Sequence, residues 1–379
     1  MRILVLSKRQ YTNLDLIDDR FGRLRELPLG LAAIGREVRG ICLSYRPRDE
    51  GRRPDIRKNA RVDWQALNLR RLLPWGSKKN YWDALGLTGR GFKPDLIWAC
   101  SDMFHAVLAV PVARRMKAAL VIDLYDNFES FPAARIPGLR LLFRRALRRA
   151  DGVTCVSRPL AEYVRDTSAC RCPVAVIENA VPAGIFRPLD KTDCRRRLGL
   201  PAEGLLIGTA GAISNSRGIG VLFEAFEQLA RQRADVHLVL AGTRDKDLRI
   251  PDSPRIHYLG MLPPATIPAF LSTLDISVIC NRASSFGRYC FPQKFYESVA
   301  CGLPVVAAKT GVLADLLKDY PDLLFEPEND ESLLGALNRQ IKNPHIPPIE
   351  PPAWSQQAGQ LNDFFISVFN RQMSLVRRG

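Results

Sequence analysis

Short apolar runs alternate with amphipathic segments along most of the chain. In the first half, continuous apolar stretches predict buried strands at residues 2–6, 38–43, 96–100, 119–123 and 152–156. Segments with apolar residues on one helical face predict helices at residues 22–35, 104–117 and 138–150. Strands that are apolar throughout and alternate with helices are typical of a doubly wound α/β sheet. Residues 46–93 form a long, basic stretch that contains Pro and Trp and whose structure this pattern leaves undecided.

The second half of the chain repeats this scheme. It predicts strands at residues 204–209, 236–241, 276–280 and 304–308, and helices at 219–232, 266–274, 292–300 and 331–341. Two prolines and a glycine within residues 181–190 predict a linker. We therefore expect two Rossmann-like domains, residues 1–185 and 186–352, that face each other across a cleft. A terminal helix within residues 353–379 should pack back towards the first domain. Ligands should bind at the carboxyl ends of the strands.

Composition narrows the class of protein. The chain has 379 residues, which suits two domains, and its 46% apolar and 25% charged residues are ordinary for a globular protein. No apolar run is long enough to span a membrane, and the first residues lack the pattern of a signal peptide. Nine cysteines without metal-ligand spacing predict reduced thiols and no metal site. Together these features favour a cytoplasmic protein.

The net charge of +16 is unevenly distributed. Residues 1–190 hold 34 basic and 20 acidic side chains, whereas the remaining residues hold 21 and 19. A basic first half predicts an anionic partner, such as a membrane surface, a phosphorylated acceptor or a nucleic acid. A nucleic acid is disfavoured because no aromatic-interleaved recognition motif accompanies the arginines. An arginine-rich surface that meets only solvent remains the alternative.

A glycine-containing loop at residues 209–226 is the first candidate for chemistry. It follows a predicted strand and leads into a predicted helix, with Gly211 and Gly218 allowing a close approach to a ligand. Backbone N–H groups at a helix start favour phosphate, and Arg217 adds a permanent cation that can contact phosphate oxygens. A loop of this kind can also be purely structural.

A second candidate is the segment 291–307. Lys294 lies in the first turn of the predicted helix, where the helix dipole disfavours a cation, so we expect it to have an anionic partner. Glu297 follows one turn later and can accept hydrogen bonds from a vicinal diol such as that of ribose. The alternative is a Lys–Glu pair on a solvated helix face.

These segments resemble the donor half of glycosyltransferase family 4, whose members have the GT-B fold. The family pattern "P-x-K-x-x-E-x-x-A-x-G-x-P-V-V" is matched from Pro292 to Val306. Residues 149–157, 176–188, 256–260 and 274–280 also look like the family's strands and linker. The resemblance is strong over residues 149–330 and weak over 1–95.

The resemblance implies a retaining transferase that uses a UDP-, GDP- or dTDP-sugar and needs neither a cofactor nor a metal for phosphate binding. Arg217 and Lys294 would neutralise the donor diphosphate and stabilise the leaving group, and Glu297 would hold the ribose hydroxyls. Residues Ser285, Phe286 and Gly287 would contact the sugar. A lipid-linked or polysaccharide acceptor in cell-surface glycan synthesis would explain the basic first half, as would peripheral attachment to the inner face of the cell membrane.

The chain departs from the family at several positions. Tyr289 stands where many members have a second glutamate, and Ala212 stands where an arginine is common. Either phosphate binding relies on Arg217 and Lys294 alone, or another basic residue substitutes, with Arg282 and Arg288 as the candidates. Near residue 123, where members often have a histidine, the sequence DLYDNFES offers two carboxylates for acceptor-side chemistry, those of Asp126 and Asp123. A capping role is the alternative for either aspartate. None of the four histidines is predicted to be catalytic.

The acceptor side is less defined. The loop at residues 8–23 should face the cleft, with Gly22, Arg20 and Arg23 lining an acceptor or phosphate pocket. The basic amphipathic segment 137–152 should either cover the sheet or dock on anionic lipid. The segment 75–82, with Trp75, Tyr81, Trp82 and two lysines, suggests another interfacial patch.

Two other functions remain compatible with the sequence. A nucleotide-sugar epimerase can share this architecture and would turn over donor without an acceptor. A catalytically degenerate GT-B scaffold is suggested by Tyr289 and Ala212 and would bind nucleotide weakly.

Overall fold

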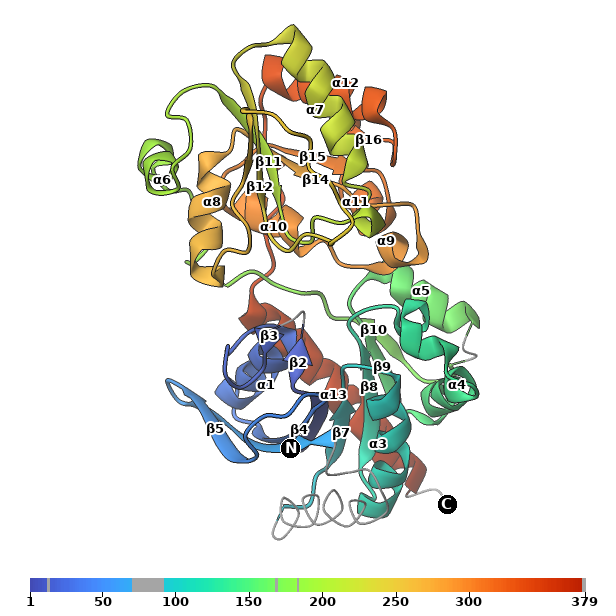
Figure 1. The fold of residues 1–379 in the computed structure, drawn as a ribbon. Coiled ribbons are helices and arrows are strands. Elements are labelled where there is room, and N and C mark those ends of the chain that lie inside the picture. The colour runs from blue at the N-terminus through green and yellow to red at the C-terminus, as the bar shows by residue number, and fades with distance from the viewer. Residues whose placement is uncertain (12–13, 70–91, 168–169, 183, 377–379) are drawn as a thin grey trace. The chain divides into compact units, whose positions relative to one another are not determined.

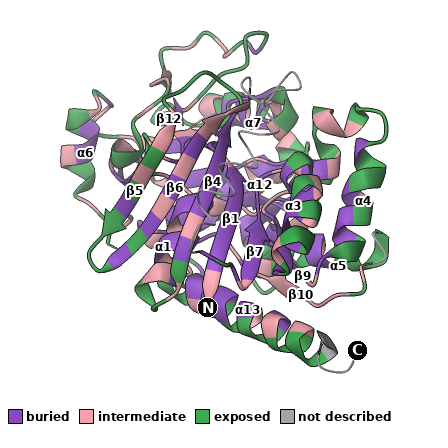
Figure 2. Cartoon of the chain, turned by 90° about the horizontal axis from the view of Figure 1, so that it is seen from below, coloured by how far each residue is buried: buried purple, intermediate pink, exposed green. Residues whose placement is uncertain are grey.

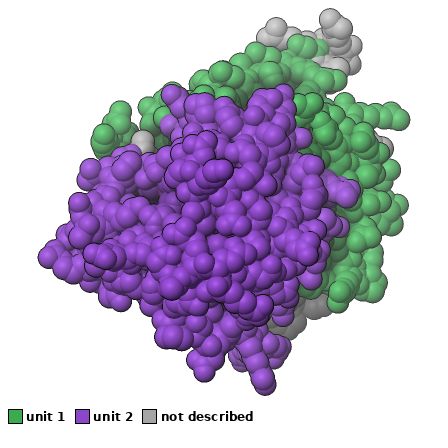
Figure 3. Space-filling view, turned by 90° about the horizontal axis from the view of Figure 1, so that it is seen from above, with its two compact units in different colours: residues 1–179, 354–379 green, residues 180–353 purple. Residues whose placement is uncertain are grey.

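The protein consists of two compact units, seen in a computed structural model that describes residues 1–11, 14–69, 92–167, 170–182 and 184–376. Residues 1–179 and 354–379 form unit 1, and residues 180–353 form unit 2 (Figure 3). The chain thus leaves unit 1 after Asn179, slightly before the expected boundary at 185, and returns to it with its last helix. The predicted patch at 75–82 lies outside the described residues.

Unit 1 is built on an eight-stranded sheet with the order β10-β9-β8-β7-β1-β4-β6-β5. The strands are β1 (Arg2–Lys8), β4 (Glu37–Ser44), β5 (Gly51–Arg57), β6 (Ala60–Asn68), β7 (Leu96–Ala99), β8 (Ala119–Leu124), β9 (Gly152–Cys155) and β10 (Val174–Val176). All neighbours are parallel except the hairpin of β5 and β6. A two-stranded ribbon, β2 (Gln10–Tyr11) with β3 (Leu14–Asp15), follows β1.

The helices of unit 1 cover this sheet. They are α1 (Arg23–Ala33), α3 (Met103–Met116), α4 (Leu139–Arg149), α5 (Arg158–Thr167) and α13 (Trp354–Val376), with short 3-10 turns at Phe128–Ser130 and Pro132–Arg135. Helix α13 buries Ala358, Leu361, Phe365 and Val368, spaced three or four residues apart, so one face lies on the unit and the other in solvent (Figure 2). A Cβ on Gly30 of α1 would lie 2.5 Å from the Cβ of Ala358, so only glycine permits this close crossing.

Unit 2 contains a second, six-stranded parallel sheet with the order β13-β12-β11-β14-β15-β16 (Figure 1). The strands are β11 (Leu205–Ala210), β12 (Val236–Ala241), β13 (Ile256–Tyr258), β14 (Ile276–Ile279), β15 (Val305–Ala308) and β16 (Leu324–Phe325). The helices are α6 (Lys191–Arg197), α7 (Gly220–Gln232), α8 (Ile267–Thr273), α9 (Ser285–Tyr289), α10 (Gln293–Ala300), α11 (Gly311–Leu316) and α12 (Asp330–Lys342), joined by 3-10 turns at Asn215–Arg217, Pro264–Thr266 and Pro321–Leu323.

Each sheet has a point where the chain reverses the direction in which it adds strands. In unit 1, β4 and β6 lie on one side of β1, and β7 to β10 lie on the other. In unit 2, β12 and β13 lie on one side of β11, and β14 to β16 lie on the other. The loops that leave two adjacent strands at such a switch point diverge, which opens a crevice at the carboxyl edge. The two switch points therefore lie between β1 and β7 and between β11 and β14.

Candidate functional site

The backbone after β11 passes very close to the loop after β12. Gly211 has φ 132° and Gly242 has φ 136°, values that side-chain-bearing residues rarely adopt. A Cβ on Gly242 would lie 1.7 Å from the carbonyl oxygen of Gly211. The nearest atom to a Cβ built on Gly211 is Cε of Lys294, at 3.9 Å. The predicted Gly211 loop and the predicted Lys294 helix are therefore neighbours at the carboxyl edge of this sheet.

Lys294 and Glu297 form an ion pair on α10. Nζ of Lys294 lies 2.7 Å from Oε2 of Glu297, and Nε2 of Gln293 donates to Oε1 at 3.2 Å. The Glu297 side chain is only 5% exposed, whereas that of Lys294 is 39% exposed. The pair therefore does not lie on a solvated helix face. A buried carboxylate orients an ammonium that remains open to solvent, and its oxygens retain lone pairs for further donors.

Arg217 lies at the end of the 3-10 turn that follows β11. Its guanidinium carbon is 4.0 Å from the centroid of the Phe286 ring, so the planar group stacks on the aromatic face. Stacking leaves the N–H groups at the guanidinium edge able to donate to an anion. Gly218 follows with φ 71° and ends the turn, and a Cβ there would meet the Arg282 side chain at 3.1 Å.

Helix α9 holds the three residues expected to contact a sugar. Its N-cap is Ser284, whose Oγ accepts from the N–H of Gly287 at 3.1 Å. Gly287 is buried against the carbonyl oxygen of Arg282, which a Cβ would approach to 2.0 Å. Ser285 is exposed and Phe286 is half-buried beneath Arg217. Phe286 thus supports the basic group, and Ser285 is the residue of the three that offers a free hydroxyl.

Two arginines were candidates to substitute for the basic residue that Ala212 replaces. Arg282 instead pairs with Glu328 at 2.8 Å, with both side chains about half exposed. Arg288 is exposed at the end of α9. Ala212 itself is exposed beside the Gly211 turn. Arg217, in the turn after β11, and Lys294, on α10 beside Gly211, therefore remain the two basic residues assigned to the diphosphate.

The switch point of unit 1 carries a polar cluster that the sequence did not reveal. Asp102 caps α3: its Oδ1 accepts from the backbone N–H of His105 at 3.0 Å and from Nδ1 of the same residue at 2.8 Å. The hydroxyl of Tyr45 donates to the other oxygen of Asp102 at 2.6 Å. Ser101 has φ 99°, a strained value for a non-glycine residue, and its Oγ accepts from the N–H of Lys8 at 2.9 Å.

Burial, neighbouring charges and hydrogen bonds shift the pKa values of Asp102 and Lys8 in this cluster. Burial alone would raise the pKa of Asp102, but the charge and hydrogen bonds of His105 and the hydrogen bond from Tyr45 outweigh it and hold that pKa far below its usual range. Burial lowers the pKa of the Lys8 ammonium, and the carboxylates of Asp102 and Asp126 partly oppose the shift. Asp102 is therefore a structural anion that already accepts three hydrogen bonds from its neighbours.

The two aspartates predicted for acceptor-side chemistry have different environments. Asp123 is fully buried and pairs with Arg23, whose Nη2 lies 2.8 Å from its Oδ1, and it also accepts from Thr154 at 2.6 Å. Asp123 and Arg23 are thus structural, and the prediction that Arg23 lines a pocket is wrong. Asp126 is half-buried after β8, accepts from the N–H of Asn127 at 2.8 Å, and contributes to the field at Lys8.

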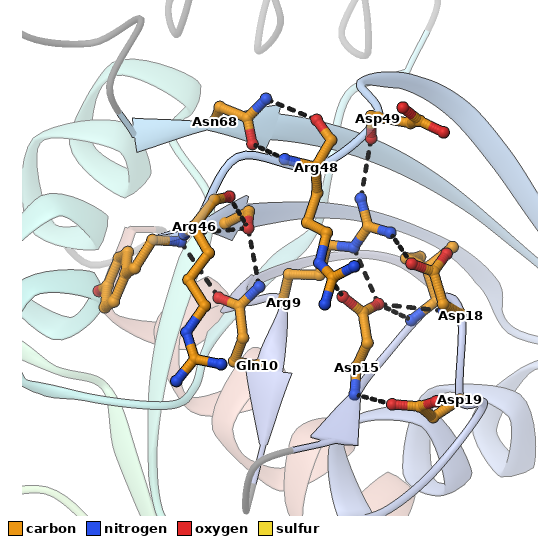
Figure 4. A network of polar contacts seen from close by, with 12 residues as sticks. Arg9, Gln10, Asp15, Asp18, Asp19, Arg46, Arg48, Asp49 and Asn68 are labelled. Carbon is orange, nitrogen blue, oxygen red and sulfur yellow. Dashed lines mark hydrogen bonds and ion pairs between the residues drawn. The ribbon is translucent and has the colours of Figure 1, made fainter.

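The loop after β1 is held by a network of its own (Figure 4). Arg9 is 1% exposed; its Nε donates to Asp15 at 2.8 Å, its Nη2 to Asp18 at 2.7 Å and its Nη1 to the Asp49 carbonyl at 2.8 Å. Asp19 accepts from the N–H of Asp15 at 2.6 Å. This part of the predicted pocket loop is consequently tied to the protein rather than presented to a ligand.

Comparison with known families accounts for both sheets. Residues 204–343 match the domain family "Glycosyl transferases group 1", and residues 23–180 match "Glycosyl transferase 4-like domain". The chain belongs to the family 4-type glycosyltransferases. The predicted family is therefore confirmed, and each of its domains corresponds to one of the two units.

Curated relatives of this glycosyltransferase are distant. A D-inositol 3-phosphate glycosyltransferase of Acidothermus cellulolyticus is 27% identical over 44% of this chain and 40% of its own length. A putative teichuronic acid biosynthesis glycosyltransferase of Bacillus subtilis, TuaH, is 26% identical over 65% of this chain and 58% of its own length. The chain thus spans about half the length of these curated relatives.

Solved structures establish the GT-B fold. Sucrose-phosphate synthase from Thermosynechococcus elongatus superimposes with a TM-score of 0.70 at 18% identity, covering 100% of this chain and 98% of that one. Anabaena HepE in complex with UDP-glucose superimposes with a TM-score of 0.64 at 18% identity, covering 100% of both chains. The predicted fold class is confirmed.

The part of this glycosyltransferase that the structure describes contains neither a candidate metal cluster nor a membrane-spanning helix. Within the described residues, no group of three or more His, Cys, Asp or Glu side chains is arranged to hold a metal ion. None of the described helices combines the length and the apolar character needed to cross a membrane.

Proposed function

We propose that the protein transfers a sugar from a nucleotide-diphosphate sugar to a lipid-linked or polysaccharide acceptor in cell-surface glycan synthesis, with retention of configuration. The observation that carries this proposal is Lys294, an accessible ammonium fixed by the buried Glu297 at the switch point of unit 2. The UDP-glucose bound by HepE and the teichuronic acid role named for TuaH support the donor and acceptor classes, respectively.

The donor diphosphate is assigned to the crevice between β11 and β14. Lys294 approaches it from α10 and Arg217 from the turn after β11, and the positive φ of Gly211 lets the backbone pass without a side chain. Negative charge grows on the diphosphate as the glycosidic bond breaks, so two fixed cations stabilise the transition state more than the ground state. In this scheme the protein's own side chains supply the charge for which other enzymes use a metal.

Glu297 binds the ribose hydroxyls, and Ser285, Phe286 and Gly287 lie on the side of the sugar. One Glu297 oxygen is oriented by Lys294 and the other by Gln293, so a diol that donates to them meets a preorganised acceptor. Tyr289 replaces the second glutamate of many relatives and leaves the α9 segment to select the sugar.

Unit 1 is assigned to the acceptor. Asp126, near the ammonium of Lys8, is proposed as the polar group that meets the acceptor hydroxyl. The surplus of basic residues in the first half of the chain favours an acceptor that carries phosphate, and it also favours peripheral attachment at the inner face of the cell membrane.

A thermal-shift screen of UDP, GDP, dTDP and their sugars tests this assignment. A ligand that binds only the folded chain adds about 2.7 kcal/mol to the free energy of unfolding when its concentration is one hundred times its Kd. The transition temperature rises accordingly. We expect one nucleotide class to stabilise the protein equally with and without EDTA. The absence of a shift with every nucleotide would support a degenerate scaffold instead.

The reaction itself is tested with the donor that this screen selects. Incubation with a lipid-phosphate acceptor, followed by NMR of the product, should show an anomeric configuration like that of the donor. Conversion of the donor alone into an epimeric free sugar would identify an epimerase and contradict the proposed transfer.

A further inference from the structure

Exposed apolar side chains gather in one short stretch of unit 1. Four large ones lie within twelve residues: Phe131 at 36% exposure, Ile136 at 47%, Leu141 at 51% and Leu142 at 47%. The stretch comprises the 3-10 turn Pro132–Arg135, the connection after it and the first half of α4. Scattered single exposures are normal on a protein surface, but a local group of this size marks a contact surface.

Helix α4 has two different faces. Leu139, Phe143, Ala146 and Leu147 are buried and hold the helix on the unit, beside α3 (Figure 2). At 3.6 residues per turn, the opposite face carries Leu141, Leu142, Arg145, Arg148 and Arg149, all exposed. We call this set the outer face of α4.

The arginines on the two sides of α4 differ in whether they have an acidic partner. Arg144 and Arg140, which border the buried side, both approach Glu129, at 2.8 Å and 3.8 Å. Arg145, Arg148 and Arg149 of the outer face have no acidic partner among the residues that the structure describes. Arg135, in the preceding turn, also has none there. The outer face is therefore both apolar and strongly positive.

We propose that the outer face of α4, with Phe131 and Ile136, docks on the surface of a lipid bilayer that contains anionic phospholipids. This names the contact surface for the peripheral attachment proposed above. The exposed leucines lie in the first turn of α4, the three arginines follow in its later turns, and no acidic side chain of the outer face offsets their charge, so this face is complementary to an apolar layer covered by phosphates. At a bilayer surface the leucines can enter the acyl boundary while the arginine stems snorkel to the phosphates.

Rigid attachment of α4 supports this assignment. The buried face of the helix packs beside α3 and on Phe128, with the Phe128 and Phe143 rings 6.3 Å apart. The helix is therefore already formed and pays no folding cost on binding, unlike a segment that folds only at the membrane. Docking should leave the catalytic unit 2 unchanged, so its failure and failure of the proposed transfer are separable.

The test is co-sedimentation of the full chain with vesicles of phosphatidylcholine containing roughly one third phosphatidylglycerol. We expect binding to these vesicles, little binding to pure phosphatidylcholine, and a strong loss between about 0.1 M and about 0.5 M NaCl. The variant R145Q/R148Q/R149Q should bind about a hundredfold more weakly, since each basic residue near such a surface contributes about fivefold. The variant L141S/L142S should lose about tenfold.

A matched control removes the same number of charges from unit 2. Arg196, Arg197 and Arg231 are 70–80% exposed, and R196Q/R197Q/R231Q should bind vesicles like the wild type. Equal losses in both triple variants would show that net charge alone drives binding and would overturn the proposal. So would failure of the wild type to bind anionic vesicles.

Folding and donor binding are monitored in every variant. The α4 variants should keep the wild-type circular dichroism spectrum and the wild-type thermal shift with nucleotide. If R145Q/R148Q/R149Q fails to fold, L141S/L142S decides alone, and wild-type vesicle affinity in that variant would overturn the assignment.

Discussion

The two switch points occupy the same topological position in the two sheets, yet they treat charge in opposite ways. In unit 2, Lys294 is held by a single buried carboxylate and remains 39% exposed. In unit 1, Asp102 is enclosed by donors from His105 and Tyr45, and Lys8 is close to two carboxylates. The first arrangement leaves cationic capacity for an anionic ligand, whereas the second is largely neutralised from within.

This difference in charge between the two switch points indicates which unit is better suited to bind a diphosphate. A ligand with two or more negative charges gains most where a fixed cation still has donors to spare: the Lys294 ammonium gives one N–H to Glu297 and keeps two, so this ion pair need not be broken. The cluster in unit 1 suits hydroxyl groups, which exchange single hydrogen bonds at little cost. The proposed division of labour between a donor side and an acceptor side would thus follow from side-chain electrostatics, on two sheets of similar topology.

Lys294→Ala should produce the largest effect. Removal of one fixed donor to a developing anion typically costs two to three orders of magnitude in turnover. We expect kcat/KM for the donor to fall by about 10²–10³, with the fold intact because Lys294 is at the surface of α10. Steady-state assays at limiting donor measure this. Wild-type-like transfer by K294A would remove Lys294 from the site.

Arg217→Ala should rank next. The guanidinium is stacked on Phe286 rather than anchored by an ion pair, so part of its contribution comes from orientation. We expect R217A to lower kcat/KM by about 10–10². The variant R217K should recover about half of that loss in activation free energy, because it keeps the positive charge but lacks the planar guanidinium. Arg282→Gln serves as the control, because that residue pairs with Glu328. An equal loss in R282Q would mean that the general field, not Arg217, matters.

Lys8→Met should sharpen the comparison by affecting the other substrate. Lys8 belongs to the unit 1 cluster, so we expect about a tenfold loss in acceptor-dependent turnover. The Kd for nucleotide should change less than about twofold, since that site is on unit 2. Isothermal titration and initial-rate assays on one preparation separate the two effects. A large loss of nucleotide affinity would contradict the division between the units.

The smallest effect concerns acid stability. A carboxyl whose pKa is lower in the folded than in the unfolded chain adds stability above the unfolded pKa of about 3.9, and this stability is lost as the pH falls further. Asp102 has such a depressed pKa. The stability advantage of wild type over D102N should therefore shrink by about 0.7 kcal/mol between pH 7 and about pH 3.5. Urea unfolding over this range measures it, and a constant difference would contradict the assigned environment.

Much of the fold was predictable because its strands are buried on both faces. The segment 236–241, apolar except for His237, coincides with β12, and the pattern around Lys294 places the start of α10 within one residue. Strand β5 was missed because it lies at the sheet edge, where charged residues such as Arg52 and Arg53 hide the alternation. Strand β6, ARVDWQALN, does alternate between buried and more exposed positions, so its pattern was readable and was overlooked. Helix α6, KTDCRRR, was missed because it is polar almost throughout.

In the candidate site, contacts between residues close in the sequence were predictable, and contacts between distant residues were not. Lys294 and Glu297 belong to one short helix, so their spacing in the sequence fixes their contact. Arg23 was misassigned because its partner Asp123 is a hundred residues away, and nothing local announces a buried pair. The Asp102–His105 contact left one signal that could have been used, an N-cap aspartate three residues before a histidine at a strand-to-helix turn.

The central claim is that Lys294 is an accessible cation reserved for the donor diphosphate, and titration calorimetry of the preferred nucleoside diphosphate tests it most directly. Lys309 provides the matched control, since it also lies on unit 2 and pairs with a glutamate, Glu326 at 3.0 Å, but both side chains are more than half exposed. The account predicts at least a tenfold weaker Kd for K294A and an unchanged Kd for K309A. Equal affinities in the wild type and both variants would contradict it.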